Sequence, residues 1–204
     1  MSIRRRHTMR QSPIDINTKV ATMDTDKCTP LLIRFTPGDC HEVAVQECGN
    51  WKVTARKNST SSLRGSHLPG SYRLLQFHAH WGGSEHTVNG KQYAGEIHFV
   101  YWNTRYASPE VACSKSDGLA VLGVFVEEGK ENDAMELLLD SHGRFFTYLG
   151  GLTTPPYTEC VVWTLLQTPI TFSEAQLLAL QELIPSNWRE CQKLHGRKVY
   201  CSKL

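Results

Sequence analysis

Long hydrophobic runs are missing from this sequence. The longest unbroken apolar stretch, residues 119–126, has eight residues, far fewer than the ~20 that a membrane-spanning helix needs. The basic N-terminal decapeptide MSIRRRHTMR is not followed by the apolar core of a secretory signal, although arginines without acids are also typical of a mitochondrial presequence. We therefore expect no membrane span and no secretion.

Cysteine motifs and an excess of one charge are also missing. The seven cysteines are an odd number and show no CxxC spacing, which suits reduced thiols in the cytosol. Residues 11–204 hold 18 basic and 20 acidic residues, with no basic stripe interleaved with aromatics, so we expect no nucleic-acid partner. For 204 residues with 40% hydrophobic content, we predict a disordered basic extension over residues 1–10 and a single domain over residues 11–204.

Short segments rich in β-branched and aromatic residues dominate the rest of the chain. The predicted strands cover residues 31–35, 51–55, 72–81, 96–102, 119–126 and 160–168, and the Ser-rich segment 58–66 is predicted to be a loop. Two helices are predicted, one at residues 132–140 and one that a capping box of Ser173 and Gln176 opens and Pro185 ends. The expected architecture is mainly β (α+β), with peripheral helices.

Histidines at strand spacing provide the first sign of chemistry. Side chains alternate between the faces of a strand, so Gln76, His78 and His80 share one face, and Glu96 and His98 share a face of the next strand. Three histidines from two neighbouring strands, with polar residues to receive their second N–H groups, suit a zinc site with one open position. The spacing alone leaves open that these are polar residues on a solvated face.

Longer motifs give the chain a resemblance to the α-class carbonic anhydrases. The matching segments occur in the family's order and span nearly the whole chain: residues 11–16 (QSPIDI), 72–82 (YRLLQFHAHWG), 84–88 (SEHTV), 95–98 (GEIH), 117–123 (DGLAVLG), 152–156 (LTTPP) and 187–189 (NWR). The resemblance implies a central, twisted, mostly antiparallel sheet. It also implies zinc-dependent reversible hydration of CO2 to bicarbonate and a proton by zinc-bound hydroxide.

The resemblance assigns roles to individual residues. Zn²⁺ would be bound by His78, His80 and His98. The groups that would orient these rings are Gln76 for His78, Glu96 for His98 and the backbone carbonyl of Asn187 for His80. Thr153 would accept a hydrogen bond from the hydroxide and donate a hydrogen bond from its own hydroxyl to Glu85. Without the resemblance, Thr153 would be interpreted as a turn residue and Glu85 as a surface acid. The CO2 pocket would be formed by Thr153 and by Val100, Val121, Leu152, Thr154, Val161 and Trp163, of which the apolar members could equally be core residues.

Several positions depart from the family pattern. Asn50 falls where fast members have a proton-relaying histidine, and a neutral amide cannot titrate. His67 could replace that histidine or be a solvated loop residue. The family's aromatic N-terminal segment is absent, and only Gly83 separates the matching segments 72–82 and 84–88. Between Asp140 and Phe146, roughly two dozen residues that the family has are absent. We therefore expect missing family elements.

The departures leave an alternative function open. The chain could be a catalytically impaired or silent relative that acts as a binding protein, or a truncated isoform. Cys160 matches a buried free thiol of intracellular members, whereas the cysteines typical of secreted members are absent. The cytoplasm is therefore the expected location, the mitochondrial matrix is the alternative, and a monomer is the expected state.

Overall fold

The computed structural model describes residues 9–45, 51–130, 144–183 and 185–202. In chain order the elements are β1 (Asp15–Ile16), β2 (Thr22–Met23), β3 (Leu32–Arg34), β4 (Cys40–Val45), β5 (Trp51–Ala55), β6 (Ser62–Arg64), β7 (Tyr72–Trp81), β8 (Thr87–Val88), β9 (Gly95–Asn103), α1 (Pro109–Cys113), β10 (Leu119–Glu128), β11 (Phe145–Gly150), β12 (Val161–Leu166), β13 (Ile170–Phe172), α3 (Glu174–Leu183) and β14 (Tyr200–Cys201).

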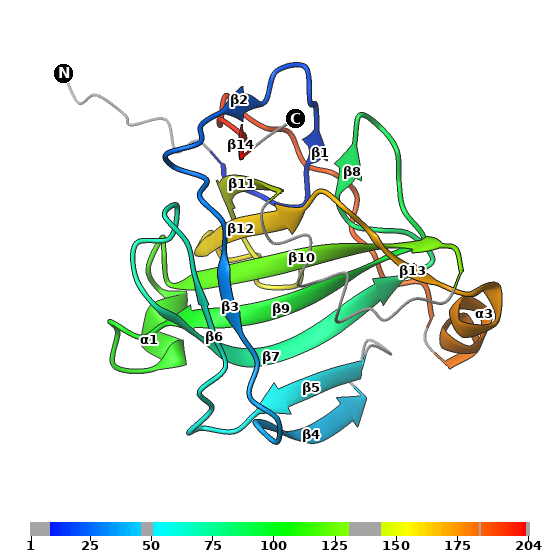
Figure 1. Cartoon of the computed structure of the whole chain (residues 1–204), viewed down its shortest axis with the longest axis horizontal. Helices are drawn as coiled ribbons and strands as arrows, with labels where there is room; N and C mark the ends of the chain where they lie inside the picture. Colours follow the sequence, from blue (N-terminus) through cyan, green and yellow to red (C-terminus); the bar gives the residue numbers. More distant parts are fainter. Residues whose placement is uncertain (1–8, 46–50, 131–143, 184, 203–204) are drawn as a thin grey trace.

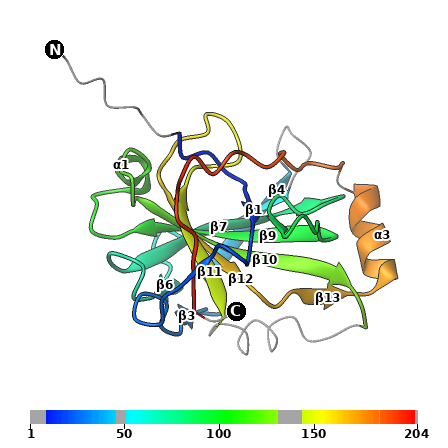
Figure 2. The ribbon, with the colours of Figure 1, turned by 90° about the horizontal axis from the view of Figure 1, so that it is seen from above.

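One large twisted sheet organises the described part of the chain (Figure 1). Its main path runs β2-β14-β11-β12-β10-β9-β7-β5-β4, with β13 beside β10 and β6 joining β3 to β7. Most pairs are antiparallel, and β10 pairs in parallel with β12 and β13. The helices α1 and α3 lie at opposite ends of the sheet (Figure 2). The predicted mainly β fold with peripheral helices is confirmed.

Strand alternation divides the buried side chains between the two faces of the sheet. One apolar cluster includes Ala79 and Trp81 of β7 and Leu122 of β10, and we call its side the core face. The other cluster includes Val121 of β10 and Trp163 of β12. We call this second side the site face, because it carries the predicted functional residues.

The predicted strands all appear. The strands β5 and β7 have the predicted bounds, and the others differ by a few residues at their ends. The capping box of α3 is formed: Ser173 N donates to Gln176 Oε1 at 2.9 Å, and Gln176 N donates to Ser173 Oγ at 3.3 Å. The helix predicted at residues 132–140 lies outside the described residues.

The predicted loop at residues 58–66 is partly wrong. It contains β6, which pairs with β3 on one side and with β7 on the other. Backbone pairing on both sides makes this three-residue segment a strand, although it is too short to show an alternating pattern.

The first described residues near the N-terminus are hydrogen-bonded to the rest of the structure. Arg10, assigned above to the extension, donates from its backbone N to Glu159 Oε1 at 2.8 Å. Residues 1–8 lie outside the described residues, and the division into an extension and one domain stays a prediction. None of the described helices is long and apolar enough to cross a membrane.

Candidate metal and catalytic site

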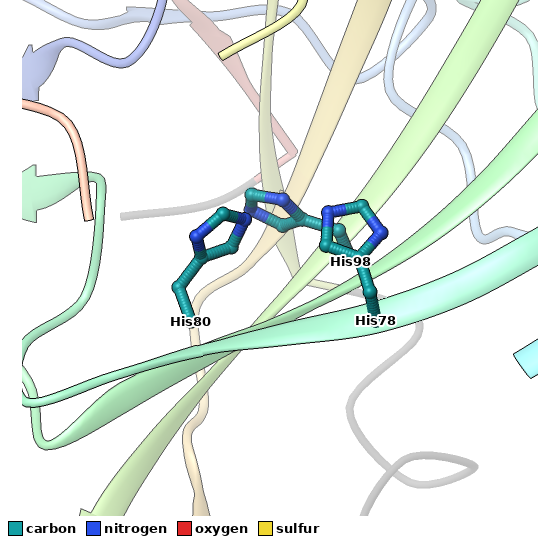
Figure 3. Close-up of side chains that lie close together, drawn as sticks. All are labelled: His78, His80 and His98. Atoms are coloured by element: carbon teal, nitrogen blue, oxygen red, sulfur yellow. The ribbon is translucent and has the colours of Figure 1, made fainter. Parts of the chain in front are cut away.

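Three histidine rings converge on the site face (Figure 3). His78 and His80 come from β7, and His98 lies directly opposite His78 on β9. The ring centroids of the three pairs are 4.8 to 5.3 Å apart. One nitrogen of each ring lies within 4.8 Å of the corresponding nitrogens of the other two. Strand alternation and register therefore bring together three potential metal ligands.

Hydrogen bonds fix the orientation of each ring. Every ring has one nitrogen facing an acceptor: His78 Nδ1 lies 2.8 Å from Gln76 Oε1, His80 Nδ1 lies 2.7 Å from the carbonyl of Asn187, and His98 Nε2 lies 2.8 Å from Glu96 Oε1. Because a neutral imidazole carries one N–H, the second nitrogen of each ring keeps its lone pair. The three free lone pairs form a nitrogen donor set of the kind that zinc prefers.

The charge states of the rings are set by burial and by neighbouring groups. Burial, followed by the nearby rings of His98 and His80, lowers the pKa of His78 well below its usual value. Burial also lowers the pKa of His80, against the opposing effect of Glu85. Both rings are therefore neutral near pH 7, which is the form that binds a metal. For His98 burial acts in the same direction, but the charge and hydrogen bond of Glu96 raise its pKa.

A pair of buried acceptors provides a test of whether a cation fits. His80 Nε2 and Glu85 Oε2 are buried without hydrogen-bond partners, and they are 3.3 Å apart. Since Nδ1 of His80 carries the proton, both atoms present lone pairs to each other. A positive charge beside them would turn this repulsion into attraction. The residues present therefore fit a metal cation.

Behind His98 lies a buried carboxylate network. Glu96 is fully buried, and its two carboxylate oxygens are hydrogen-bonded to three nitrogens, each at 2.8 Å: His98 Nε2, His86 Nδ1 and the backbone N of His86. Burial alone would raise the pKa of Glu96, but the two histidines hold it well below its usual range. A Cβ at Gly123 would lie 3.0 Å from Glu96 Oε1, so glycine leaves room for this carboxylate.

His86 is a site residue that the sequence reasoning missed. Its Nε2 lies 2.7 Å from the Tyr148 hydroxyl, which donates to Ser12 Oγ at 2.8 Å. His86, Glu96 and His98 also cluster as possible metal ligands, but hydrogen bonds to Glu96 already occupy Nδ1 of His86 and Nε2 of His98, and the bond to Tyr148 occupies Nε2 of His86. The only sequence signal for His86 was its place in the matching segment 84–88.

The expected hydrogen bond from Thr153 to Glu85 is not formed among the described residues. Glu85 Oε1 accepts from the backbone N of Arg189 at 3.0 Å, and Oε2 has no donor. Oε2 faces the rings instead, 3.3 Å from His80 Nε2 and 3.8 Å from His98 Nδ1. Thr153 is buried, with 8% of its surface exposed, in the loop after β11. The expectation is corrected on this point, because Glu85 is turned toward the histidines.

Most of the expected CO2-pocket residues lie together on the site face. Val100, Val121, Val161 and Trp163 are buried in one apolar cluster, and Leu152 packs against it. The Trp163 ring centroid is 4.9 Å from that of His98. Thr154 is exposed, at a bend of the loop after β11.

Neither expected proton-relay position is found beside the rings. Asn50 lies outside the described residues. His67 lies on the core face, with Nε2 2.8 Å from Thr164 Oγ1 and its ring 4.8 Å from that of Phe145. Burial lowers the pKa of His67 to about 4. His67 is therefore not a substitute relay, because the sheet separates it from the three rings. It lies in a turn between β6 and β7, as expected of a loop residue, but it is partly buried and not fully solvated.

His67 lines a cavity of about 540 Å³ that includes none of the three clustered histidines. Its other lining residues include Thr147 and Val162, which alternate with site-face residues along β11 and β12. Tyr148, which is bonded to His86, also lines this cavity, so the cavity borders the site-face network without including the three rings.

Known proteins are similar to this chain over most of its length. The chain is 36% identical to carbonic anhydrase 3 of Bos taurus and 34% identical to carbonic anhydrase 3 of Homo sapiens. Each alignment covers 94% of this chain and 89% of the relative over 232 positions. These positions exceed the 204 residues of the chain by 28, so at least that many positions of each relative have no counterpart here. The prediction that family elements are missing is confirmed.

A family model extends the comparison along the whole chain. The model for eukaryotic-type carbonic anhydrase matches residues 2–142 and 133–203. The two matches meet next to the segment where the sequence predicts missing residues. Taken with the relatives at 34% to 36% identity, this match shows that the chain belongs to the eukaryotic-type carbonic anhydrase family of enzymes.

Proposed function

We propose that this protein catalyses the zinc-dependent, reversible hydration of CO2 to bicarbonate and a proton. The observation that carries the proposal is the set of three histidine nitrogens within 4.8 Å of one another, directly beside an apolar wall. His78, His80 and His98 would hold the ion. Zinc bound there would supply the Lewis acidity that makes water nucleophilic near neutral pH, chemistry for which carbonic anhydrases are the standard example.

The apolar wall and Thr153 would position the reactants. CO2 is small and has no net dipole, so it would bind against Val100, Val121 and Trp163, where water binds poorly. The Thr153 hydroxyl is proposed to orient the nucleophile by accepting its hydrogen bond. Glu85, anchored by Arg189 N, would place negative charge beside the rings and so favour a cation.

Zinc content of the purified full chain tests the metal part of the proposal. We predict one zinc ion per chain, because the three lone pairs are already oriented by their hydrogen bonds. His98→Ala should abolish binding. His41→Ala removes an exposed histidine of the edge strand β4 and should leave it unchanged. Elemental analysis is the measurement, and folded protein without zinc, or zinc that persists in His98→Ala, would contradict the proposal.

Stopped-flow CO2 hydration on the same samples separates catalysis from metal binding. A second candidate function, a silent relative that binds without catalysis, is favoured by the missing Thr153–Glu85 hydrogen bond. Zinc-loaded protein that hydrates CO2 faster than buffer, and slower in His98→Ala, supports the enzyme. Zinc-loaded protein with no rate above buffer supports the binding protein.

We also propose that the protein acts in the cytoplasm as a monomer. The six described cysteines are free thiols, as in a reducing compartment. Sedimentation of the purified chain tests the oligomeric state, and cell fractionation tests the location.

A further inference from the structure

Three arginines gather on one face of the neighbouring strands β3, β6 and β7 (Figure 1). Arg34 of β3 is directly opposite Ser62 of β6, and Ser62 is directly opposite Arg73 of β7. Residues that oppose each other in paired strands share a face of the sheet, so these three side chains form one row. Arg64 is two residues after Ser62 and projects from the same face.

The opposite face of these strands is buried. Leu63 and Tyr72, which alternate with the row, belong to the core-face cluster and are 0% exposed, and Ile33 packs against them. The arginines therefore point away from the core. They line a hollow of about 600 Å³ together with hydroxyl side chains that include Ser62 and Ser71. A hollow of this volume suits a small molecule.

The three guanidinium groups have few partners within the protein. Among the described residues, the exposed Arg34 has no hydrogen bond, ion pair or ring contact. Arg64 donates from Nε to Ser71 Oγ at 3.1 Å. Arg73 makes one long hydrogen bond, at 3.5 Å to a backbone carbonyl, and lies 5.7 Å from the ring centroid of Trp102. Most N–H donors of the three arginines are therefore available to a ligand.

The hollow also carries an excess of positive charge. None of its lining residues is acidic. Asp39 is bonded to the wall at residues 59–61, but four donors already occupy Oδ2 of its carboxylate. Three arginines against one carboxylate repel one another unless an anion lies between them.

We propose that this hollow binds a small oxyanion of the phosphate class, either inorganic phosphate or a phosphate monoester. A guanidinium presents its N–H donors as a planar fork that matches two phosphate oxygens. Arg34 and Arg73 would bind the anion from the two sides of Ser62, and Arg64 would bind it from the next position along β6. Phosphate can engage several of these donors at once, because it has up to two negative charges and three or four free oxygens. The hollow includes none of the three clustered histidines, so its ligand does not depend on the proposed zinc chemistry.

Calorimetric titration of the full chain with inorganic phosphate at low ionic strength tests the proposal. We expect saturable binding of one phosphate per chain. Arg34→Ala should weaken it ~10-fold, the scale of losing the hydrogen bonds of one charged side chain. The matched control Arg144→Ala removes an exposed arginine outside the hollow and should leave the affinity unchanged. Should Arg34→Ala not fold, the same change at the exposed Arg64 replaces it.

Amide chemical shifts in the same titration show where the anion binds. Changes are expected at Ser62 and Arg73. A parallel titration with phenyl phosphate distinguishes the two sources: tighter binding than inorganic phosphate assigns the hollow to monoesters, and weaker binding assigns it to the free anion.

Four results would overturn the proposal. They are the absence of saturable binding, equal weakening in Arg34→Ala and Arg144→Ala, shift changes confined to the strand segments around His78 and His98, and bicarbonate binding as tight as that of phosphate. The second result would indicate diffuse attraction to positive charge, and the third would place the anion at the candidate metal centre.

Discussion

At the residue scale, the site depends on two kinds of buried polar atom: ring nitrogens that are fixed by one hydrogen bond, and atoms that have no hydrogen-bond partner. The ring nitrogens of His78, His80 and His98 that face Gln76, Asn187 and Glu96 are fixed by hydrogen bonds. His80 Nε2 and Glu85 Oε2 have no such partner. Buried acceptors without donors are costly, so their retention side by side indicates a ligand site.

Thr153→Ala should separate orientation of the nucleophile from metal binding. We expect turnover to fall on the order of 10²-fold, the scale of losing one orienting contact, while zinc content stays at one per chain. Thr153 is buried, it follows Leu152 that packs against the apolar wall, and it is not one of the three proposed metal ligands. Stopped-flow rates and elemental analysis on the same sample provide the measurement.

The control for Thr153→Ala is the same change at Thr60, an exposed threonine. Thr60→Ala should alter neither quantity. Parallel loss of zinc and turnover in Thr153→Ala would show instead that Thr153 supports the fold of the site.

At the element scale, period-two patterns predicted the strands that hold the site. Alternation in β7 and β9 was enough to put His78, His80 and His98 on one face, because both strands are long. Short elements were harder to predict. The helix α1 has only five residues, although Ser108 caps it and Pro109 opens it. The orientation of Glu85 and the bonds of His86 could not be predicted, because they depend on partners such as Arg189 and Tyr148 that are distant in sequence.

Asp39 shows how a side chain can hold an element in place, and it predicts a pH effect. Its Oδ2 accepts four hydrogen bonds, from Ser59 Oγ, Thr60 N, Ser61 N and Ser61 Oγ, so the turn before β4 is bound to the segment before β6. The Ser61 hydroxyl is the largest cause that lowers the pKa of Asp39 from 3.8 to about 2. The folded state therefore favours the charged form, so the stability that Asp39 contributes is present above pH ~4 and is lost as the pH falls through ~2.

We expect Asp39→Asn to unfold at lower urea concentration than the parent at neutral pH, because the amide is a weaker acceptor for four donors. The difference should shrink below pH ~4 and vanish only below pH ~2, where Asp39 of the folded parent is also uncharged. Urea unfolding across this range is the measurement. Asp26→Asn, at an exposed aspartate, should match the parent throughout, and a difference that does not vary with pH would refute this account of Asp39.

At the scale of the whole molecule, a chain that lacks at least 28 positions of its relatives still builds the family's sheet around three histidines. The strands β7, β9, β10 and β12 that carry the site are adjacent in the sheet. The motifs of these strands were recognisable in the sequence because each one lies within a continuous segment. The consequences of the missing residues were not, since they depend on how distant segments repack.

Proton release from the proposed reaction depends on groups from the whole molecule. Hydration produces a proton, which must leave the buried site through a group that titrates near neutral pH. Among the described residues, no other histidine ring both contacts the three rings and is free of partners. His67 is across the sheet, and His86 is bonded to Glu96 and Tyr148. His41 is on the edge strand β4, two strands from β7, and His195 is exposed in a turn before β14.

We therefore predict that proton transfer limits the maximal rate of CO2 hydration, and that this rate rises with the concentration of an imidazole-type buffer. Asn50→His should raise the rate at low buffer and weaken the dependence on buffer, because the resemblance to the family predicts a relaying histidine at the position of Asn50. Stopped-flow rates over a buffer series are the measurement, with His67→Ala as the control that should leave the dependence unchanged. A rate that is high and insensitive to buffer in the parent protein would show that another group carries the proton.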